Sequence, residues 1–315
     1  MMDILLLIVG LVLILGGANY LTDGASALAQ RLRMPDFLIG LTIVAVGTSM
    51  PEMVVSVMSA INGQPDMSIG NVVGSNLFNV LVILGVCAAI RPLSFSKNTV
   101  LFDIPFGVAA AFLLMVMALD TVFEFGPVNS LSRVDGIIML CLYIGLMIYT
   151  IRVAERPAEG DSTEKPMAIW LMAVMIIGGL CGLIFGGNLF LDSATNIARS
   201  LGVSESVIAI TLVAGGTSLP ELASSVVSLI KGKADMALGN VIGSNIANIL
   251  LILGLSATIT PLSLGGITPF DLMMVVLSAM LVFATSITFR RNRLDRAEGV
   301  IFLVIYALYI YRLIA

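Results

Sequence analysis

The chain contains no histidine and carries little charge of either sign. Of its 315 residues, only 11% are Asp, Glu, Lys or Arg, whereas 58% are hydrophobic. A soluble domain carries about 25% charged residues, so this chain cannot cover itself with a polar surface and is expected to fold in lipid. The absence of histidine also removes the commonest metal ligand and the usual proton carrier near neutral pH.

Cysteine and basic clusters are equally scarce. The three cysteines stand alone in apolar runs and form no disulfide or metal-binding pattern. The formal net charge is −4, and no cluster of Lys and Arg interleaves with aromatic residues, so nothing points to nucleic-acid binding. The sequence offers no catalytic Asp pair and no nucleophile with a neighbouring base. We therefore predict a protein that is not an enzyme and has no cofactor.

Long hydrophobic runs dominate the rest of the sequence. A membrane-spanning helix needs about 20 apolar residues, and ten runs meet that length. The first run lacks a basic leader and a small-residue cleavage site, so we expect it to be retained as a span. The ten expected spans lie near residues 3–28, 36–61, 67–90, 98–120, 134–153, 167–197, 204–230, 236–260, 268–289 and 297–314. This pattern predicts an all-α membrane protein.

The chain contains an internal repeat. Residues 42–79 recur at 211–248 with a constant offset of 169 and no gap, and 22 of the 38 aligned positions are identical. The residues that are kept are largely the polar and helix-breaking ones, which a purely structural duplication would not need to preserve. In the first copy they are Gly47, Thr48, Ser49, Pro51, Glu52, Ser56, Gly70, Asn71, Gly74, Ser75, Asn76 and Asn79.

Ten spans and one duplication divide the chain into two sets of five. With an odd number of spans per repeat, the second half must enter the membrane from the opposite side. We therefore predict two inverted five-helix repeats, at 1–153 and 167–315, related by a pseudo-two-fold axis in the membrane plane and joined by a linker at 154–166.

The distribution of Lys and Arg predicts the orientation. The connections after spans 1, 3, 5, 7 and 9 hold 13 of the 16 basic residues. Cytoplasmic loops are the ones enriched in Lys and Arg. We therefore expect a multi-pass protein of the cell (inner) membrane with a cytoplasmic linker and both termini outside.

Two acids lie where lipid surrounds the chain. Glu52 and Glu221 are near the middle of spans 2 and 7, where an ionised carboxylate costs several kcal/mol unless it is compensated. Pro51 disrupts the preceding helical turn, so we expect a helix opened around Gly47–Pro51, with carbonyls such as those of Val46 and Gly47 left without partners. Irregular backbone at this depth is tolerated only where it is buried or lines a cavity.

The next span of each repeat carries further polar residues. Gly70 and Gly74 are expected to break or thin span 3, and they also permit close helix packing. Ser75 and Asn79 stand four residues apart on one helix face. Four other asparagines are predicted to hydrogen-bond the opened backbone rather than to bind an ion directly: Asn71, Asn76, Asn240 and Asn245.

These residues together describe a cation site. Two carboxylates combine with hydroxyl, amide and carbonyl oxygens, and neither sulfur nor imidazole is present. Such ligands suit a hard cation. Two negative charges match one Ca²⁺, or two to three Na⁺ assisted by neutral dipoles, and electrostatics disfavours binding both at once. Competition of this kind is the physical basis of ion exchange.

The two Gly-Thr-Ser-x-Pro-Glu and Gly-Asn-Val-x-Gly-Ser-Asn stretches resemble the two α-repeats of the sodium/calcium exchanger family, within the cation/Ca²⁺ antiporter superfamily. The size is that of prokaryotic members. The resemblance covers nearly the whole chain, and it implies a ten-helix inverted-repeat fold in which spans 1 and 6 slide to gate access. It implies metal-ion ligands at Thr48, Ser49, Glu52, Ser75, Asn79, Thr217, Ser218, Glu221, Ser244 and Asn248.

Two departures from relatives bear on the counter-ion. Some relatives have Asp at the position of Asn248, so the amide here removes one possible charge and leaves the Na⁺ stoichiometry open. Proton-coupled relatives typically have Glu at the positions of Gly74 and Gly243, and its absence favours Na⁺ over H⁺.

The expected function is therefore an antiporter that exchanges Na⁺ for Ca²⁺ by alternating access at a midplane site formed by both repeats. The alternatives are an antiporter of Ca²⁺ or another divalent cation against H⁺, in which the two glutamates carry protons, and a cation channel. Channels usually build their filters from oligomeric rings, which disfavours the last. The expected partners are Ca²⁺, Na⁺ and the lipid bilayer, with no nucleic acid and an open oligomeric state.

Two further acids have two interpretations. Asp23 and Asp192 occupy equivalent positions in the long spans 1 and 6. They either line an ion path or make hydrogen bonds between helices or at the membrane interface.

Overall fold

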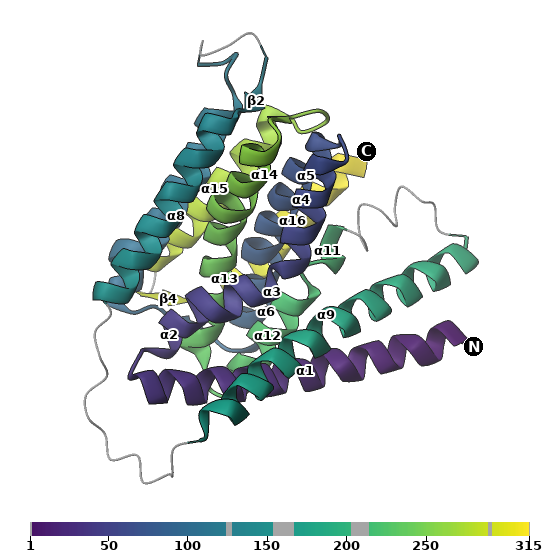
Figure 1. The fold of residues 1–315 in the computed structure, drawn as a ribbon, viewed down its shortest axis with the longest axis vertical. Coiled ribbons are helices and arrows are strands. Elements are labelled where there is room, and N and C mark those ends of the chain that lie inside the picture. The colour runs from purple at the N-terminus through teal and green to yellow at the C-terminus, as the bar shows by residue number, and fades with distance from the viewer. Residues whose placement is uncertain (1, 124–127, 154–166, 203–213, 289–291, 315) are drawn as a thin grey trace. The chain divides into compact units, whose positions relative to one another are not determined.

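The computed structural model describes residues 2–123, 128–153, 167–202, 214–288 and 292–314, which are mostly helical (Figure 1). The α-helices are α1 (Met2–Leu32), α2 (Asp36–Ile39), α3 (Ala45–Thr48), α4 (Met50–Ile61), α5 (Pro65–Leu77), α6 (Gly85–Ile90), α7 (Ile104–Ala118), α8 (Arg133–Val153), α9 (Ile169–Ser200), α11 (Ala214–Gly216), α12 (Leu219–Ile230), α13 (Ala234–Ile246), α14 (Gly254–Ile259), α15 (Pro269–Ile287) and α16 (Arg296–Ile314). The π-helical segments are η1 (Gly40–Val44), η2 (Phe78–Leu84), η3 (Thr99–Asp103) and η5 (Ala247–Leu253). The short strands are β1 (Leu93–Ser94), β2 (Ser130–Leu131), β3 (Leu262–Ser263) and β4 (Arg293–Leu294).

Most of the expected spans are present as apolar helices. In the described part of the chain, seven helices are long and apolar enough to cross a membrane: Met2–Leu32, Pro65–Ile90, Thr99–Ala118, Arg133–Val153, Ile169–Ser200, Ala234–Ile259 and Pro269–Ile287. The bent pair Asp36–Thr48 and Met50–Ile61 makes an eighth if it counts as one span. Of the expected span 204–230, residues 203–213 lie outside the described residues. The last expected span is the helix α16, which is not among these eight.

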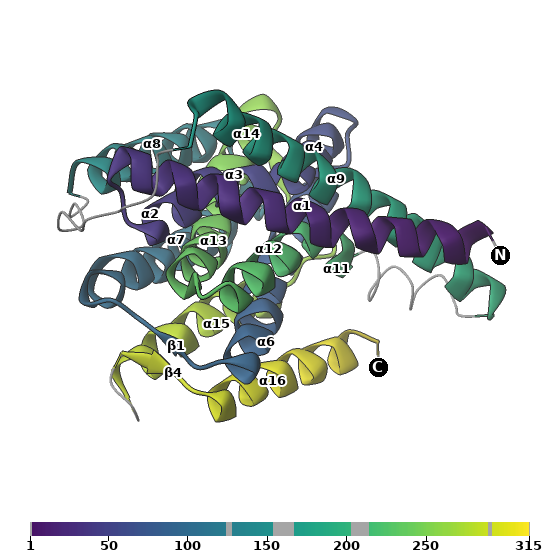
Figure 2. The ribbon, with the colours of Figure 1, turned by 90° about the horizontal axis from the view of Figure 1, so that it is seen from below.

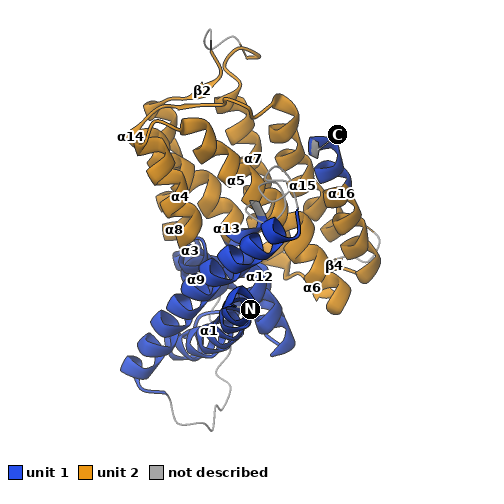
Figure 3. Ribbon diagram, turned by 90° about the vertical axis from the view of Figure 1, so that its right-hand side faces the viewer, with its two compact units in different colours: residues 1–49, 149–243, 308–315 blue, residues 50–148, 244–307 orange. Residues whose placement is uncertain are grey.

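The helices form two compact units that each draw on both halves of the sequence (Figure 3). Unit 1 contains residues 1–49, 149–243 and 308–315, and unit 2 contains residues 50–148 and 244–307. The predicted division at 1–153, 154–166 and 167–315 follows the repeat rather than this packing and stays a prediction, and the linker 154–166 lies outside the described residues.

The internal repeat is visible in the secondary structure. The bounds of α4, α5, η2, α6 and β1 recur, each shifted by 169 residues, as those of α12, α13, η5, α14 and β3. The local sequence pattern of the repeat therefore sets helix ends, π-helical segments and strands in the same way in both copies.

In unit 1, the long helices α1 and α9 run antiparallel with their backbones in contact (Figures 1 and 2). A Cβ atom on Gly10 would lie 2.9 Å from the carbonyl oxygen of Gly186, and one on Gly17 would lie 2.7 Å from that of Gly179. Gly10 and Gly17 are the repeat equivalents of Gly179 and Gly186. The two contacts thus exchange under the repeat, as a two-fold relation between α1 and α9 requires.

Unit 2 shows the same exchange. A Cβ atom on Gly85 would lie 3.0 Å from the carbonyl oxygen of Gly299, and one on Gly136 would lie 2.7 Å from that of Gly254. Gly254 is the repeat equivalent of Gly85, and Gly136 and Gly299 each stand three residues after the first residue of their helices, α8 and α16. Glycine is needed at these positions because a larger residue would meet backbone, which cannot move aside like a flexible side chain.

Two short antiparallel strand pairs join elements of the two halves within unit 2. In β1 and β4, Leu93 pairs with Leu294, and in β2 and β3, Leu131 pairs with Leu262 (β1 and β4 in Figure 2). All four leucines are fully buried. Each half therefore contributes one strand to each pair.

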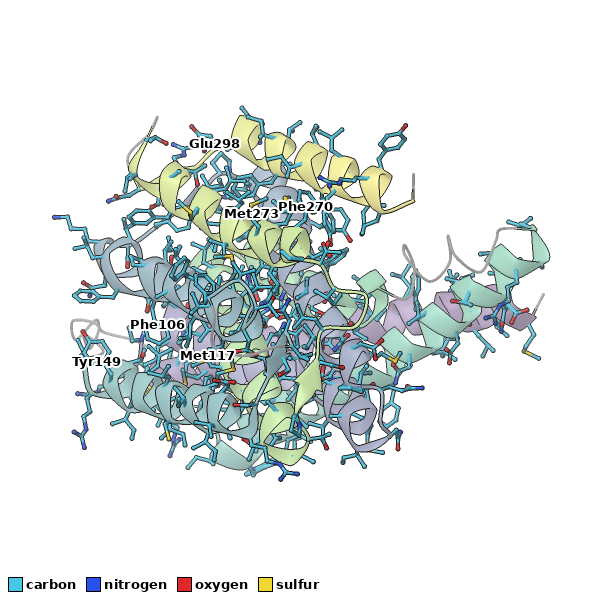
Figure 4. All side chains as sticks on the ribbon, turned by 90° about the horizontal axis from the view of Figure 1, so that it is seen from above. Phe106, Met117, Tyr149, Phe270, Met273 and Glu298 are labelled. Atoms are coloured by element: carbon cyan, nitrogen blue, oxygen red, sulfur yellow. The ribbon has the colours of Figure 1, made fainter. Side chains whose placement is uncertain are left out.

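Helices α7 and α15 pack against each other and carry large apolar side chains. Phe106 and Met117 come from α7, and Phe270 and Met273 come from α15 (Figure 4). Met273 is exposed. Exposed apolar side chains of this kind are expected where lipid rather than water surrounds a helix.

Candidate functional site

The helix of span 2 is interrupted where the sequence predicts it. Helix α3 ends before Ser49, whose φ of −81° and ψ of 10° leave the helical region, and α4 then starts at Met50. The two parts are bent by 48°. Backbone N–H groups at the end of α3 donate to the carbonyl oxygens of Ala45 and Gly47. The break is therefore confirmed, whereas the open carbonyl predicted for Gly47 is wrong because the local turn satisfies it.

The second repeat has the same turn. Ser218 has a φ of −87° and a ψ of 10° before α12 begins. The breaks place Glu221 in the first turn of α12 and Glu52 in the first turn of α4. Both residues are fully buried. A helix N-terminus carries partial positive charge and favours a carboxylate, so each break creates a position where a buried acid is less costly.

In unit 1, residues from the two repeats meet at Glu221. The Ser49 hydroxyl donates to Glu221 Oε1 at 2.7 Å, and the Thr48 hydroxyl donates to Asn240 Oδ1 at 3.2 Å. The other carboxylate oxygen, Glu221 Oε2, is buried and has no hydrogen-bond partner among the described residues. Among residues whose positions are described, one oxygen of this carboxylate is therefore hydrogen-bonded and the other is not.

Two asparagines hold the backbone at the breaks. Asn240 Nδ2 donates to the Glu221 carbonyl oxygen at 3.4 Å and to Ser225 Oγ at 2.9 Å. Asn71 Nδ2 makes the equivalent bonds in the first repeat, to the Glu52 carbonyl oxygen at 3.2 Å and to the equivalent serine at 3.0 Å. The predicted role of these two asparagines, hydrogen-bonding the backbone of the opened helix, is confirmed.

In unit 2, three predicted ligands present buried oxygens without partners. Ser75, Asn79 and Asn248 are fully buried, and Ser75 Oγ, Asn79 Oδ1 and Asn248 Oδ1 accept no hydrogen bond from the described residues. The Asn248 amide nitrogen donates to Asn76 Oδ1 at 3.2 Å. This hydrogen bond fixes the orientation of the amide, so the side-chain oxygen of Asn248 points away from Asn76 Oδ1. Asn245 Nδ2 donates to the Asn76 carbonyl oxygen at 3.5 Å, and these two asparagines are repeat equivalents.

Asn79 and Asn248 lie in π-helical segments that the sequence did not predict. Asn79 is in η2 and Asn248 is in η5, and both segments continue the preceding α-helix without a break. π-Helical turns are rare overall, and those that occur are often found at functional sites. The break predicted at Gly70 and Gly74 is wrong, because α5 runs through both residues.

The glycines of the repeated motif serve close packing instead. A Cβ atom on Gly239 would overlap the Phe37 carbonyl oxygen, and one on Gly243 would overlap that of Leu41. Both contacts lie in unit 1, where they place the first part of span 2 directly against α13. The close-packing interpretation is therefore confirmed for the second repeat.

The ten predicted ligands divide equally between the units. Unit 1 holds Thr48, Ser49, Thr217, Ser218 and Glu221, and unit 2 holds Glu52, Ser75, Asn79, Ser244 and Asn248. Their joint role as ion ligands stays a prediction, as does the convergence of the two glutamates.

Sequence reasoning missed a row of buried hydroxyls on α12. Ser224, Ser225 and Ser228 follow Glu221 along one face of the helix, and each is at most 1% exposed. Their spacing of three and four residues from the acid was the available signal.

Comparison with known proteins shows to which family the chain belongs. The family described as sodium/calcium exchanger protein matches residues 2–152 and 171–315. The chain belongs to the sodium/calcium exchanger family. This membership, together with the apolar helices, identifies an integral multi-pass membrane protein of a transporter family.

The similarity to known relatives extends over nearly the full length of the chain. A putative antiporter, CaxA, of Alkalimonas amylolytica is 35% identical over 319 residues, covering 97% of both chains. The sodium/calcium exchanger MaX1 of Methanosarcina acetivorans is 31% identical over 349 residues, covering 98% of this chain and 97% of that protein. A solved structure of the sodium-calcium exchanger NCX_Mj, soaked with 10 mM Na⁺ and zero Ca²⁺, matches with a TM-score of 0.85 and 30% identity over 98% of each chain.

Proposed function

We propose that the chain is a secondary antiporter that exchanges Na⁺ for Ca²⁺ by alternating access. The observation that carries this proposal is the buried carboxylate of Glu221, whose Oε1 accepts a hydrogen bond from Ser49 of the other repeat while Oε2 has no hydrogen-bond partner among the described residues. A buried polar atom without a partner requires an explanation, and an ion that binds there is one. The family and the ions named for its relatives support the same exchange.

The neutral ligands of unit 2 add to this support. Ser75 Oγ, Asn79 Oδ1 and Asn248 Oδ1 are oxygens, and none accepts a hydrogen bond from the described residues. Ca²⁺ takes about 6–8 oxygen ligands, so two carboxylates need such neutral groups to complete a coordination shell. Glu52 and Glu221 would supply the two negative charges that one Ca²⁺ balances. The transported ions are substrates, and the proposal includes no resident cofactor.

The proposed architecture is ten spans in two inverted repeats. The exchanged glycine contacts between α1 and α9, and those that join Gly85 with Gly299 and Gly136 with Gly254, support a two-fold relation inside each unit. The basic residues support a cytoplasmic linker and both termini outside the cell membrane.

Packing around Gly243 favours Na⁺ over H⁺ as the counter-ion. Proton-coupled relatives typically have Glu at this position, but here even a Cβ atom would overlap the backbone of Leu41. A carboxylate at position 243 could enter only if span 2 moved away from α13, whereas a Cβ atom at Gly74 would meet nothing within 4 Å. The proposed site therefore has no additional acid at position 243 to carry a proton.

The decisive experiment is Ca²⁺ uptake into vesicles that contain the purified chain. With Na⁺ inside, removal of external Na⁺ should drive Ca²⁺ in, and uptake should cease when the Na⁺ gradient is collapsed. Empty vesicles and vesicles with the Glu221→Gln variant are the controls. Uptake that follows an imposed pH gradient and ignores Na⁺ would establish the proton-coupled alternative, and conductance too fast for a carrier would establish a channel.

A further inference from the structure

One face of α12 is polar from the buried acid to the end of the helix. Glu221 is followed on this face by three serines, and all four side chains are at most 1% exposed. Helix α1 packs against α12 in unit 1 and contributes Thr22 and Ser26, which are 2% and 8% exposed. We call this polar face, formed by Thr22, Ser26, Glu221, Ser224, Ser225, Ser228 and Lys231, the α1–α12 seam.

The seam is closed by direct contacts at its surface end, where Lys231 lies. The hydroxyls of Thr22 and Ser228 are 3.0 Å apart and share a hydrogen bond. Beyond them, Lys231 Nζ donates to Asp23 Oδ1 at 2.6 Å and to the Asn19 carbonyl oxygen at 3.1 Å. The Lys231 and Asp23 side chains are 26% and 46% exposed, so this end of the seam reaches the protein surface while Glu221 lies at the buried end.

The seam departs from the repeat. Its serines Ser225 and Ser228 have serine equivalents in the first repeat, and Asp23 has an equivalent acid. Two other members do not keep their polarity, because the positions equivalent to Thr22 and Ser224 hold Leu191 and Val55. The position equivalent to Lys231 holds Asn62, which is polar but carries no charge. Compared with its equivalent in the first repeat, this face is thus more polar and has a cation at its end.

Helix packing alone does not account for these features. Buried serines in membrane proteins often join helices or bond their own backbone, and the hydrogen bond between Thr22 and Ser228 fits that role. It explains neither Glu221 Oε2 at the buried end, which has no hydrogen-bond partner in the described part of the chain, nor the lysine at the surface end. A carboxylate oxygen without a partner at the end of a row of hydroxyls is an arrangement that attracts a cation.

We propose that the α1–α12 seam is the route by which cations reach Glu221 from one side of the membrane, and that Lys231 closes it in this structure. The inference rests on the proposed function. Glu221, Ser224 and Ser228 follow one another at intervals of three and four residues, which is about 4.5–6 Å along the helix axis. Hydroxyl oxygens can therefore replace lost water at each step. The Lys231 ammonium repels an entering cation and occupies Asp23, which would otherwise attract one.

Accessibility of a thiol in the seam tests this proposal without requiring transport. Ser228→Cys is introduced into the full chain after Cys87, Cys141 and Cys181 are replaced by alanine, with monodisperse elution as the check on folding. A cationic, membrane-impermeant methanethiosulfonate reagent is applied from each side of oriented vesicles, and modification is followed by mass spectrometry. Lys231→Asn, which installs the residue of the first repeat, should raise the modification rate about tenfold or more from the Lys231 side only.

The chain supplies two matched controls. Lys233 also forms an ion pair, with Asp36 at 3.0 Å, and has a similar exposed fraction of 31%, but Asp36 lies on α2 and not on α1. Lys233→Asn should leave the modification rate at position 228 unchanged. Ser59→Cys, at the repeat equivalent of Ser228, should not respond to Lys231→Asn. An unchanged rate with Lys231→Asn, or an equal rise with Lys233→Asn, would overturn the proposal, because the ion pair would then only stabilise the fold.

Cation protection separates this inference from the proposed exchange. In the Lys231→Asn background, Ca²⁺ should slow modification of Cys at position 228, and Glu221→Gln should remove that protection. A rate that Ca²⁺ does not affect would contradict a cation route. If vesicles show no Na⁺-driven Ca²⁺ uptake but protection by Ca²⁺ persists, the route stands and the assigned counter-ion fails.

Discussion

The two units hold their predicted ligands in different ways. In unit 1, Ser49 donates to Glu221, and Thr48 donates to Asn240. In unit 2, the oxygens of Ser75, Asn79 and Asn248 are buried and have no hydrogen-bond partner among the described residues. The two sets consist of similar hydroxyl, amide and carboxylate groups, so the difference lies in their hydrogen bonding and not in their chemistry.

This difference predicts opposite energetic consequences. A hydrogen bond contributes about 0.5–1.5 kcal/mol to stability, whereas a buried polar atom without a partner costs about 1–3 kcal/mol. The hydrogen-bonded ligands Thr48 and Ser49 of unit 1 should therefore stabilise the ion-free protein, whereas Ser75 and Asn79 of unit 2 should destabilise it. In unit 2, function and stability are opposed, as is common at binding sites.

The largest expected effect is the loss of a buried charge. Glu221→Gln and Glu52→Gln should each reduce Na⁺-driven Ca²⁺ uptake by about 100-fold or more, because an amide cannot balance the charge of the ion. Both residues are fully buried, and the neutral amide is cheaper to bury than a carboxylate, so the ion-free protein should remain folded. Vesicle uptake and size-exclusion profiles measure the two results. Full activity in either variant would remove that residue from the site.

Asn79→Leu is expected to separate function from stability. It replaces an amide whose two polar atoms lack partners in the described part of the chain with an apolar group of similar size. Uptake should fall about tenfold. The midpoint of thermal unfolding without ions should rise by a few degrees, corresponding to about 1–2 kcal/mol. A lower midpoint would show that Asn79 is structurally satisfied.

Ser49→Ala and Ser75→Ala form a matched pair across the two units. Ser49→Ala removes the hydrogen bond to Glu221 and should lower stability by about 1 kcal/mol, whereas Ser75→Ala removes an oxygen without a partner among the described residues and should raise it. Thermal unfolding in ion-free buffer gives the sign of each change. Equal signs would abolish the distinction between the units. Uptake should fall severalfold, by about three to ten times, in both variants.

The smallest expected effect is a difference between two equivalent asparagines. Asn71→Ala and Asn240→Ala both remove hydrogen bonds to a glutamate carbonyl and a serine. Asn240 also accepts a hydrogen bond from Thr48 and donates a long one to Ser224 Oγ at 3.4 Å. Its replacement should therefore cost about 1 kcal/mol more. Denaturation of the two variants under identical conditions measures this difference, and identical costs would show that the bonds to Thr48 and Ser224 contribute nothing.

Local chemistry explains which features the sequence could predict. The break before Pro51 depends on residues next to one another in the chain, and the structure shows the predicted interruption. The constant offset of the repeat is matched by equivalent elements that share their bounds. The role of Gly243 was only partly predictable, since the carbonyl of Leu41 that it accommodates belongs to another span.

Other features depend on contacts that the sequence pattern does not contain. A π-helical turn at Asn79 leaves no periodic signal in an apolar run. The partner of Asp23 is Lys231, 208 residues away, and it follows only once α1 is known to pack against α12. The open carbonyl at Gly47 was predicted wrongly because a tight turn recovers the lost bond, which proline alone does not reveal.

The strand pairs of unit 2 have a consequence for assembly. Each half of the polypeptide donates one strand to β1–β4 and one to β2–β3, so two separate fragments, 1–153 and 167–315, would each present both complementary edges to the other. The strand pairs therefore hold the two halves together within unit 2 through contacts that do not involve the linker.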